Sequence, residues 1–234
     1  MKLYWAVSGV ALLTACNGDA PAPQPSPSAS QQTLAGPEQR VLAVGDSLFA
    51  GYGLGPGESY PARLEAALRA RGINARIANA AVSGDTSADI RARLAFALDN
   101  QPAPPALTIV ELGGNDMLRG IAPEETRANL DAVLAELGRR KLKVLVMGML
   151  APPNLGADYR AKFDPLYPAL AKQHGAALVP FFLEAVVGKP ALVQADHVHP
   201  TAPGIEALVA DTVDEVAGAL PETGPSAAAP PSPR

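Results

Sequence analysis

Cysteine, aromatic residues and clustered positive charge are what this chain of 234 residues lacks. Its one cysteine, Cys16, excludes an internal disulfide framework. Aromatic residues make up only 5% of the chain against 48% for all hydrophobic residues, so we expect a core of alanine, leucine and valine. The net charge is −4, and no lysine/arginine cluster is dense enough to follow a phosphate backbone, which argues against nucleic acid as a partner. No motif indicates an obligate protein partner.

The N-terminus has the pattern of an export signal. Met1-Lys2 supplies the charged start and Leu3–Ala15 a short apolar stretch, which falls short of the ~20 apolar residues of a transmembrane helix. Its end, Leu-Thr-Ala-Cys at 13–16, resembles the lipobox of bacterial lipoproteins. The prediction is therefore a lipoprotein signal peptide at residues 1–15 and lipid attachment at Cys16.

Lipidation would hold the exported protein on the periplasmic face of a membrane, because acyl methylenes contribute about 0.8 kcal/mol each when buried in lipid. Asn17, rather than an acidic residue, follows Cys16, which favours the outer membrane. The alternative is an ordinary secretory signal with an incidental Cys16, which would leave a soluble periplasmic protein.

Two segments of low complexity flank the middle of the chain. Residues 16–37 are rich in Pro, Ala, Ser and Gln, and residues 221–234 have a similar composition. Such segments bury too little apolar surface to offset the entropy lost on ordering. We therefore predict a tether, a disordered tail and one folded domain at residues 38–220.

Strand-like and helix-like segments alternate within this domain. The strand candidates are short apolar runs without polar alternation, as is typical of parallel strands covered on both faces. Alternation of this kind predicts a three-layer α/β/α domain around a parallel sheet. The predicted strands are Val41–Val44, Arg76–Asn79, Leu107–Leu112, Val144–Met149 and Ala177–Phe181.

Prolines mark where helices start and break. Pro123, followed by two acidic residues, opens a helix that closes on the cations Arg139-Arg140-Lys141, as the helix dipole favours. Pro165 and Pro168 are expected to kink or break the segment Ala157–Gln173.

The first predicted strand ends abruptly in Gly45-Asp46-Ser47. In open α/β sheets the functional groups lie just beyond the carboxyl ends of the strands. Ser47 is therefore expected at the mouth of a crevice, with its own N–H free, where a nucleophile is most useful. The tripeptide alone is weak evidence, so its meaning depends on what the other strand ends supply.

Two further polar clusters follow the second and third predicted strands. In Ser83-Gly84-Asp85 the glycine allows its N–H to approach a reacting oxygen closely. In Gly113-Gly114-Asn115-Asp116 the asparagine amide can supply another donor. Together with the Ser47 N–H, these groups would form an oxyanion hole of three donors. The structural alternatives are a turn glycine and a turn cap.

The segment Asp196-His197-Val198-His199-Pro200 can supply a base. A serine hydroxyl needs a general base, and the imidazole needs a carboxylate to fix its tautomer. Residues three apart in a loop can meet, so Asp196 is expected to hold His199, whereas His197 should point elsewhere. A lone histidine is more often structural than catalytic, but the order Ser…Asp…His at successive strand ends favours catalysis.

These four blocks resemble those of the SGNH (or GDSL) hydrolases, in particular the periplasmic arylesterase and acyl-thioesterase/lysophospholipase branch. The resemblance implies a flavodoxin-like sheet of about five parallel strands. It also implies hydrolysis of acyl esters and thioesters without a metal or organic cofactor. The residues it identifies are Ser47, Asp196 and His199 as the catalytic triad and Ser47, Gly84 and Asn115 as the oxyanion hole.

The substrate pocket is less directly encoded. The apolar loop Met117–Pro123 next to Asn115 is a candidate wall for an acyl chain, or only a connector. The segment after the fourth strand is expected to border the same pocket. The substrate-binding candidates are Asp46, Met117, Leu118, Ile121 and Pro152. Aryl esters, acyl thioesters, lysophospholipids and acylated sugars share the same carbonyl chemistry, and the sequence does not rank them.

Three other functions stay open at this point. An O-deacetylase of carbohydrates or lipids would use the same residues. A non-catalytic binder of acyl chains would have no use for a base aligned with Ser47. A binuclear metallohydrolase needs a dense ligand set around two metals, and the only histidine outside the motif is His174. Its ligands would be drawn from Asp46, Asn115, Asp196, His197 and His199.

Overall fold

The computed structural model describes Leu34 and residues 36–221. The predicted signal peptide, Cys16, most of the predicted tether and nearly all of the predicted tail lie outside the described residues. Across the described residues, no helix is both long and apolar enough to cross a bilayer.

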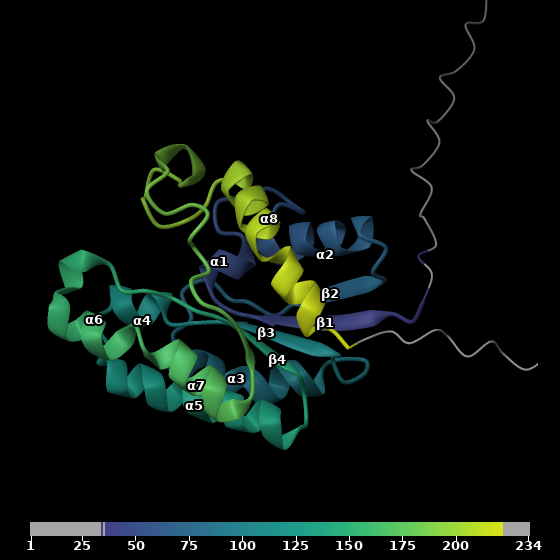
Figure 1. The fold of residues 1–234 in the computed structure, drawn as a ribbon, viewed down its shortest axis with the longest axis horizontal. Coiled ribbons are helices and arrows are strands. Elements are labelled where there is room, and N and C mark those ends of the chain that lie inside the picture. Colours follow the sequence, from purple (N-terminus) through teal and green to yellow (C-terminus); the bar gives the residue numbers. More distant parts are fainter. Residues whose placement is uncertain (1–33, 35, 222–234) are drawn as a thin grey trace, which may run out of the picture. The chain divides into compact units, whose positions relative to one another are not determined.

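Five parallel strands form one sheet in the order β2-β1-β3-β4-β5 (Figure 1). This order and the parallel pairing are those of a flavodoxin-like sheet, so the predicted fold class is confirmed. The strands are β1 (Gln39–Val44), β2 (Ala75–Asn79), β3 (Leu107–Glu111), β4 (Val144–Met147) and β5 (Ala177–Val179).

Strand β1 lies inside the sheet, between β2 and β3. Val41 pairs with Ile77 of β2 on one side and with Leu107 of β3 on the other. Successive β1 residues on both faces are buried, including the adjacent Val41 and Leu42. Coverage on both faces explains why the sequence of this strand is apolar throughout rather than alternating.

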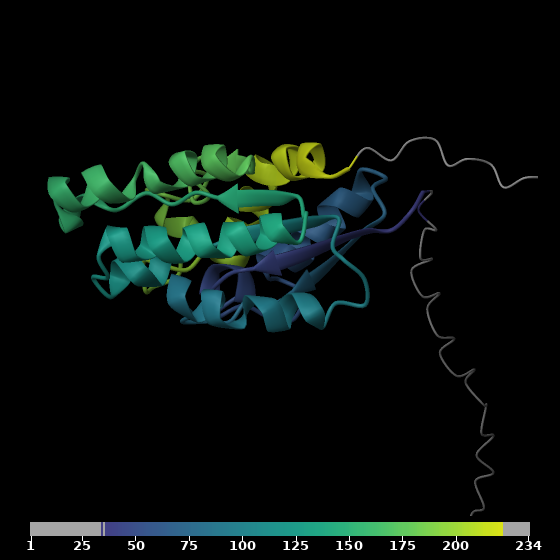
Figure 2. The same ribbon diagram turned by 90° about the horizontal axis from the view of Figure 1, so that it is seen from below.

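Helices cover both faces of the sheet. Helices α2 and α8 pack against each other on one face (Figure 1), and α3, α5 and α7 run side by side across the other (Figure 2). Right-handed crossovers between parallel strands produce this division. The bounds are α2 (Tyr60–Ala70), α3 (Ser87–Asp99), α5 (Pro123–Arg139), α7 (Leu166–His174) and α8 (Ala202–Ala219).

The remaining helices are short and lie near the carboxyl edge of the sheet or in its connections. They are α1 (Ser47–Ala50), α4 (Gly114–Leu118), α6 (Ala157–Phe163) and the 3₁₀ turns η1 (Pro153–Leu155) and η2 (Pro190–Leu192).

Proline placement explains the helix boundaries with one exception. Helix α5 begins at Pro123 and carries Arg139 in its last turn, as predicted. The segment after η1 breaks between α6 and α7, and Pro165 takes the N-cap position of α7. Pro168 does not break α7, because it lies in the first turn, where backbone N–H groups have no partner within the helix.

Three strands end earlier than the sequence predicts, because the chain leaves the sheet to build loops. The carbonyl of Leu112, just past β3, accepts the Tyr167 hydroxyl at 2.7 Å instead of a ladder partner. Beyond β4, Gly148 meets the chain after β5 so closely that a Cβ there would lie 2.2 Å from the Pro180 carbonyl oxygen. These early exits carry the following residues to the carboxyl edge of the sheet.

Candidate active site

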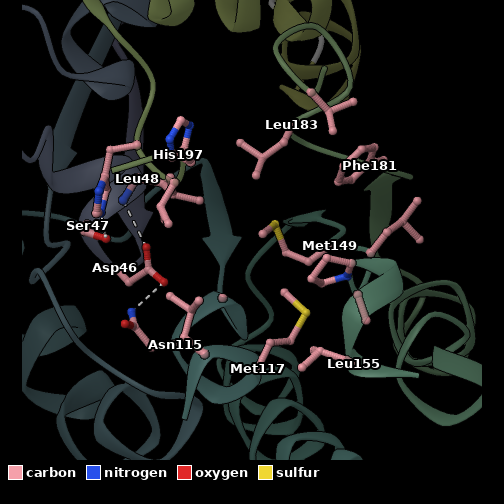
Figure 3. A pocket seen from close by; sticks show the side chains of 18 of the residues that line it. Asp46, Ser47, Leu48, Asn115, Met117, Met149, Leu155, Phe181, Leu183 and His197 are labelled. Atoms are coloured by element: carbon pink, nitrogen blue, oxygen red, sulfur yellow. Dashed lines mark hydrogen bonds between the residues drawn. The ribbon is translucent and has the colours of Figure 1, made fainter. Parts of the chain in front are cut away.

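A cavity of about 830 Å³ opens at the carboxyl edge of the sheet. Polar groups from Asp46, Ser47 and Asn115 occupy one end, and apolar side chains such as Met149 and Phe181 occupy the other (Figure 3). The carboxyl end of each strand contributes residues to the lining of this cavity. Open α/β sheets bind their ligands at this edge.

Ser47 is the first residue of α1, directly after β1. Asp46 caps this helix, because its Oδ1 accepts the Leu48 N–H at 3.0 Å. The helix ends after one turn at Gly51, whose φ of 83° is left-handed. The Ser47 N–H meets no acceptor in the part of the chain that the structure describes, so it is available to a ligand.

His199 joins Ser47 to Asp196. Its Nε2 lies 2.8 Å from the Ser47 Oγ, and its Nδ1 lies 2.6 Å from the Asp196 Oδ2. A carboxylate at Nδ1 selects the tautomer whose Nε2 can accept the serine proton. The hydrogen bond from the His199 backbone N–H, followed by that from its side chain, lowers the pKa of Asp196 to about 2. The three side chains are therefore arranged for nucleophilic attack through general-base catalysis.

The loop that carries His199 is fixed by local hydrogen bonds. Asp196 Oδ1 accepts the backbone N–H of Val198 and of His199 at 2.9 and 3.0 Å. His197, between Asp196 and Val198, takes a left-handed φ of 60°, and its side chain lines the cavity without bonding to Ser47 or Asp196 (Figure 3). The Tyr52 ring packs on the His199 imidazole, with 4.5 Å between ring centroids.

Gly84 lies in the loop after β2 and lines the cavity. Its φ of 89° is one that side-chain-bearing residues rarely adopt. No acceptor among the described residues takes its N–H. Its carbonyl oxygen accepts Nη2 of Arg119 at 2.6 Å, which ties this loop to the end of α4. The bond to the Gly84 carbonyl thus holds the residue in place while its N–H stays free.

Asn115 is placed by α4, but its amide is not free. Nδ2 donates to the Asp46 Oδ2 at 2.9 Å and to the Asp85 carbonyl oxygen at 3.0 Å. An amide nitrogen has two hydrogens, so both are engaged. Of the three donors that the sequence predicts, two meet no protein acceptor and the third would have to be shared with a bound oxygen.

Asp116 anchors α4 from within the core and does not face the cavity. Its side chain is fully buried, and its carboxylate accepts the backbone N–H and the hydroxyl of Ser87 as well as the Thr126 hydroxyl. These bonds join α4 to the starts of α3 and α5. They hold the preceding residue, Asn115, at a fixed place on the cavity wall.

One substrate-pocket candidate, Ile121, lies outside the cavity, and another, Asp46, lines it with a carboxylate that protein groups already engage. Ile121 is not part of the cavity lining. The turn at Gly120 (φ 67°) folds the Ile121 N–H back onto the Asp116 carbonyl at 2.9 Å, and the Ile121 carbonyl accepts the Tyr159 hydroxyl. Asp46 does line the cavity, but it is only 1% exposed and its carboxylate is engaged by protein donors.

The other three candidates, Met117, Leu118 and Pro152, line the cavity. Met117 and Leu118 belong to α4 rather than to the loop that the sequence suggests. Met117 is buried, whereas Leu118 is 66% exposed at the rim.

Sequence reasoning missed most of the apolar wall and one buried acid. The wall residues follow β4 and β5, and their apolar side chains look like core positions in sequence. Glu111 is the only charged residue in the apolar run of β3, which is the signal that could have identified it. The missed wall residues are Met149, Leu150, Phe181, Leu183 and Val187.

The ligand set of the metallohydrolase alternative lies around the cavity but is not arranged as a metal site. Among the residues that the structure describes, no group of three or more His, Cys, Asp or Glu side chains is arranged to hold a metal ion. Asp46 and Asn115 bond to each other, and Asp196 bonds to His199.

The described residues thus combine a parallel five-stranded sheet with a serine, a histidine and an aspartate in hydrogen-bond contact beyond its carboxyl edge. Residues 43–207 match the GDSL-like Lipase/Acylhydrolase family, and the chain belongs to this family. Its relatives are esterases, which makes it a carboxylic ester hydrolase. The resemblance seen in the sequence motifs is confirmed.

Named relatives come from several bacteria. Esterase TesA of Pseudomonas aeruginosa is 44% identical over 162 residues, which are 69% of this chain and 80% of that protein. Thioesterase 1/protease 1/lysophospholipase L1 of Escherichia coli K12 is 38% identical over 160 residues, 68% of this chain and 74% of that protein. The crystal structure of AlinE4, an SGNH-hydrolase family esterase, shares 62% identity with a TM-score of 0.68, covering 80% of this chain and 100% of that one.

Proposed function

We propose that this esterase acts by two-step acyl transfer with Ser47 as nucleophile, His199 as base and Asp196 as the group that orients His199. The 2.8 Å separation between Ser47 Oγ and His199 Nε2 is the observation that carries the proposal. At that distance a proton can pass directly from the hydroxyl to the ring.

In the first step the Ser47 oxygen attacks the ester or thioester carbonyl while His199 takes its proton. The bond to the leaving alkoxide or thiolate then breaks as His199 returns that proton to it, and an acyl-serine is formed. Asp196 stabilises the imidazolium that exists between these events. Because its pKa is lowered to about 2, Asp196 stays ionised throughout the neutral range.

The N–H groups of Ser47 and Gly84 stabilise the oxyanion, and the Asn115 amide adds a third hydrogen bond. Since both amide hydrogens are engaged, the oxyanion displaces or shares the bond to the Asp85 carbonyl, which is the weaker acceptor of the two. Each donor of such a site typically contributes about 10²–10³ in turnover.

In the second step a water molecule replaces the alcohol or thiol. His199 removes its proton, the hydroxide attacks the acyl-serine, and the proton passes to Ser47 as the carboxylic acid leaves. The apolar half of the cavity, formed by Met149, Phe181 and Leu183, supports an acyl chain or aryl ring as the group bound there. Aryl esters, acyl thioesters and lysophospholipids all present such a group.

Labelling with an organophosphonate tests the nucleophile. We expect one phosphonyl group per molecule, located on the Ser47 peptide by mass spectrometry, and loss of ester hydrolysis. Ser83→Ala is the matched control, because Ser83 lines the same cavity without contacting the triad, and it should retain both labelling and turnover. A label at another residue, or full turnover by Ser47→Ala, would contradict the proposal.

We also propose that Cys16 carries a lipid that holds the enzyme at the periplasmic face of a membrane. The support is the lipobox-like sequence that precedes it. Expression of the full chain with radiolabelled palmitate should give a labelled protein in the membrane fraction. Cys16→Ala should abolish labelling and release active enzyme, and an unlabelled wild-type protein would contradict lipidation.

A further inference from the structure

Glu111 is a buried acid at the active site for which the catalytic steps above have no use. It ends β3, and its side chain is 0% exposed. The Asp46 N–H donates to its Oε2 at 3.3 Å, and a Cβ added at Gly45 would lie 3.0 Å from the same oxygen. Its other oxygen, Oε1, is buried without a hydrogen-bond partner in the described part of the chain.

The neighbouring acid, Asp46, is much better supplied with donors. Its Oδ1 accepts the Leu48 N–H at 3.0 Å and its Oδ2 accepts the Asn115 amide at 2.9 Å. Glu111 receives one long N–H bond, and the charge that acts on it is the repulsive one of Asp46. A buried carboxyl without a counter-charge holds its proton.

The pKa shifts agree with this division of donors. Burial, then repulsion by Asp46, raises the pKa of Glu111 well above its usual range. Burial raises the pKa of Asp46 too, but the bonds from Leu48, Glu111 and Asn115 oppose it. The contact between the two acid side chains further raises the pKa of Glu111 and lowers that of Asp46, which agrees with a proton held by Glu111.

We propose that Glu111 is a positioning residue that works as a neutral acid. By keeping its proton, it leaves the one negative charge of the pair on Asp46, whose side chain caps α1 and holds the Asn115 amide. Glu111 thereby sets the direction of an oxyanion donor and the turn that presents Ser47, without touching substrate. This inference rests on the oxyanion role proposed for Asn115.

No other ionised group in the described part of the chain is placed to take over this role. Tyr167 faces Glu111 from α7, and burial raises the pKa of its phenol well above the usual range, so it stays neutral. Asp116 acts on Tyr167 rather than on Glu111. His199 acts on Asp46, and an imidazolium there would favour the Asp46 anion further.

Ionisation of Glu111 would place two carboxylates against each other in a site closed to water. Repulsion would then move the Asp46 carboxylate away from Leu48 and Asn115. Activity should therefore fall at alkaline pH, when Glu111 loses its proton, even though His199 is fully available as a base. A residue with a purely structural role would not produce this alkaline limb.

Three purified variants separate these effects when kcat and KM for an aryl ester are measured across the pH range. Glu111→Gln keeps the shape and an N–H donor but cannot ionise. Glu111→Leu removes the carboxyl group and the hydrogen bond that it accepts from the Asp46 N–H. Thr108→Val is the matched control, because Thr108 is also buried on β3 and its hydroxyl has no hydrogen-bond partner among the described residues.

We expect Glu111→Gln to retain kcat within about threefold at neutral pH and to lose the alkaline limb. Glu111→Leu should lower kcat by at least about tenfold with little change in KM, a smaller loss than the 10²–10³ of deleting an oxyanion donor outright. Thr108→Val should match the wild type. An unchanged alkaline limb in Glu111→Gln, or full kcat in Glu111→Leu, would overturn the proposal.

An infrared measurement keeps the test open if Glu111→Leu does not fold. The wild type at neutral pH should show the carbonyl stretch of a protonated carboxylic acid that is absent from Glu111→Gln, and its absence from the wild type overturns the proposal. Failure of the catalytic proposal is distinguishable, because Ser47→Ala would then retain turnover whatever the Glu111 variants do.

Discussion

The two carboxyl arrangements around Ser47 are opposites. Asp196 lies in a loop with 38% of its side chain exposed, and hydrogen bonds lower its pKa to about 2. Glu111 lies at the end of an inner strand with no exposure, and burial raises its pKa. The first environment keeps Asp196 ionised, so that its negative charge can stabilise the imidazolium of His199. The second favours the protonated form of Glu111. The environments, rather than the residue types, assign the two roles.

The two arrangements also differ in how they are built. The bonds from Asp196 reach residues two and three positions away in one loop, so a short sequence encodes them. The contacts of Asp46 join β1 to β3 and α4, with partners 65 and 69 positions away. A local motif can specify the first arrangement, whereas the second exists only once the sheet has formed.

The largest effect should come from breaking the exposed arrangement. Ser47→Ala or His199→Ala should lower kcat by about 10⁴-fold or more, because nucleophile and base act as one unit. His197→Ala is the matched control, since His197 lines the same cavity outside the triad, and it should retain measurable activity. Steady-state hydrolysis of an aryl ester measures all three, and the reverse order of the two histidines would refute the assignment.

A smaller loss of kcat should follow from removing Asn115, the member of the buried arrangement that faces the substrate cavity. Asn115→Ala removes one donor from the oxyanion site and should lower kcat by about 10²–10³ with little change in KM. Wild-type kcat in this variant would mean that the amide serves only its bonds to Asp46 and Asp85.

The sequence made one of these arrangements visible and hid the other. Ser47 stands in a short motif at a predicted strand end, and Asp196 and His199 share a second short motif, so their residue types and order could be recognised. Asn115 was visible as a donor, but its two bonds within the protein depend on the meeting of β1, β3 and the Gly84 loop. In the sequence Glu111 is a single charged residue in an apolar strand. Only its burial in the folded protein raises its pKa and favours the protonated form.

The fold was more predictable than the cavity. Apolar runs and proline positions indicated all five strands and the break between α6 and α7, because these follow from local propensity and burial. The wall residues Met149 and Phe181 could not be separated from core residues, since lining an apolar cavity and filling a core use the same side chains.

A moderate effect is expected on stability at alkaline pH, where the buried acid Glu111 and the exposed acid Asp196 should differ. An acid whose pKa is raised on folding contributes stability that is present below its unfolded pKa of about 4.3 and is lost as the pH rises through the raised value. Glu111→Gln cannot ionise, so its melting temperature should gain on that of the wild type as the pH rises. About 1 kcal/mol corresponds to about 2–4 °C in a domain of this size. A constant difference from neutral to alkaline pH would contradict a raised pKa at Glu111.

The smallest effect should be at acid pH, with the opposite sign. The pKa of Asp196 is lowered to about 2, so its contribution to stability is present above about pH 4 and is lost as the pH falls through the folded value. Asp196→Asn should be slightly less stable than the wild type at about pH 5, and the two should converge near about pH 2. Solvent screening of this exposed carboxylate keeps the difference small. Denaturant melts at the two pH values measure it, and a difference that widens towards acid would be inconsistent with the lowered pKa.

The most direct measurement is to trap the covalent intermediate. A reaction with an activated acyl ester is quenched with acid within the first turnover, and the digested protein is analysed by mass spectrometry. The account predicts a single acyl group on the Ser47 peptide in the wild type and none in Ser47→Ala. An acyl group on another residue would contradict it. So would product released in the first turnover without any acyl group on the protein.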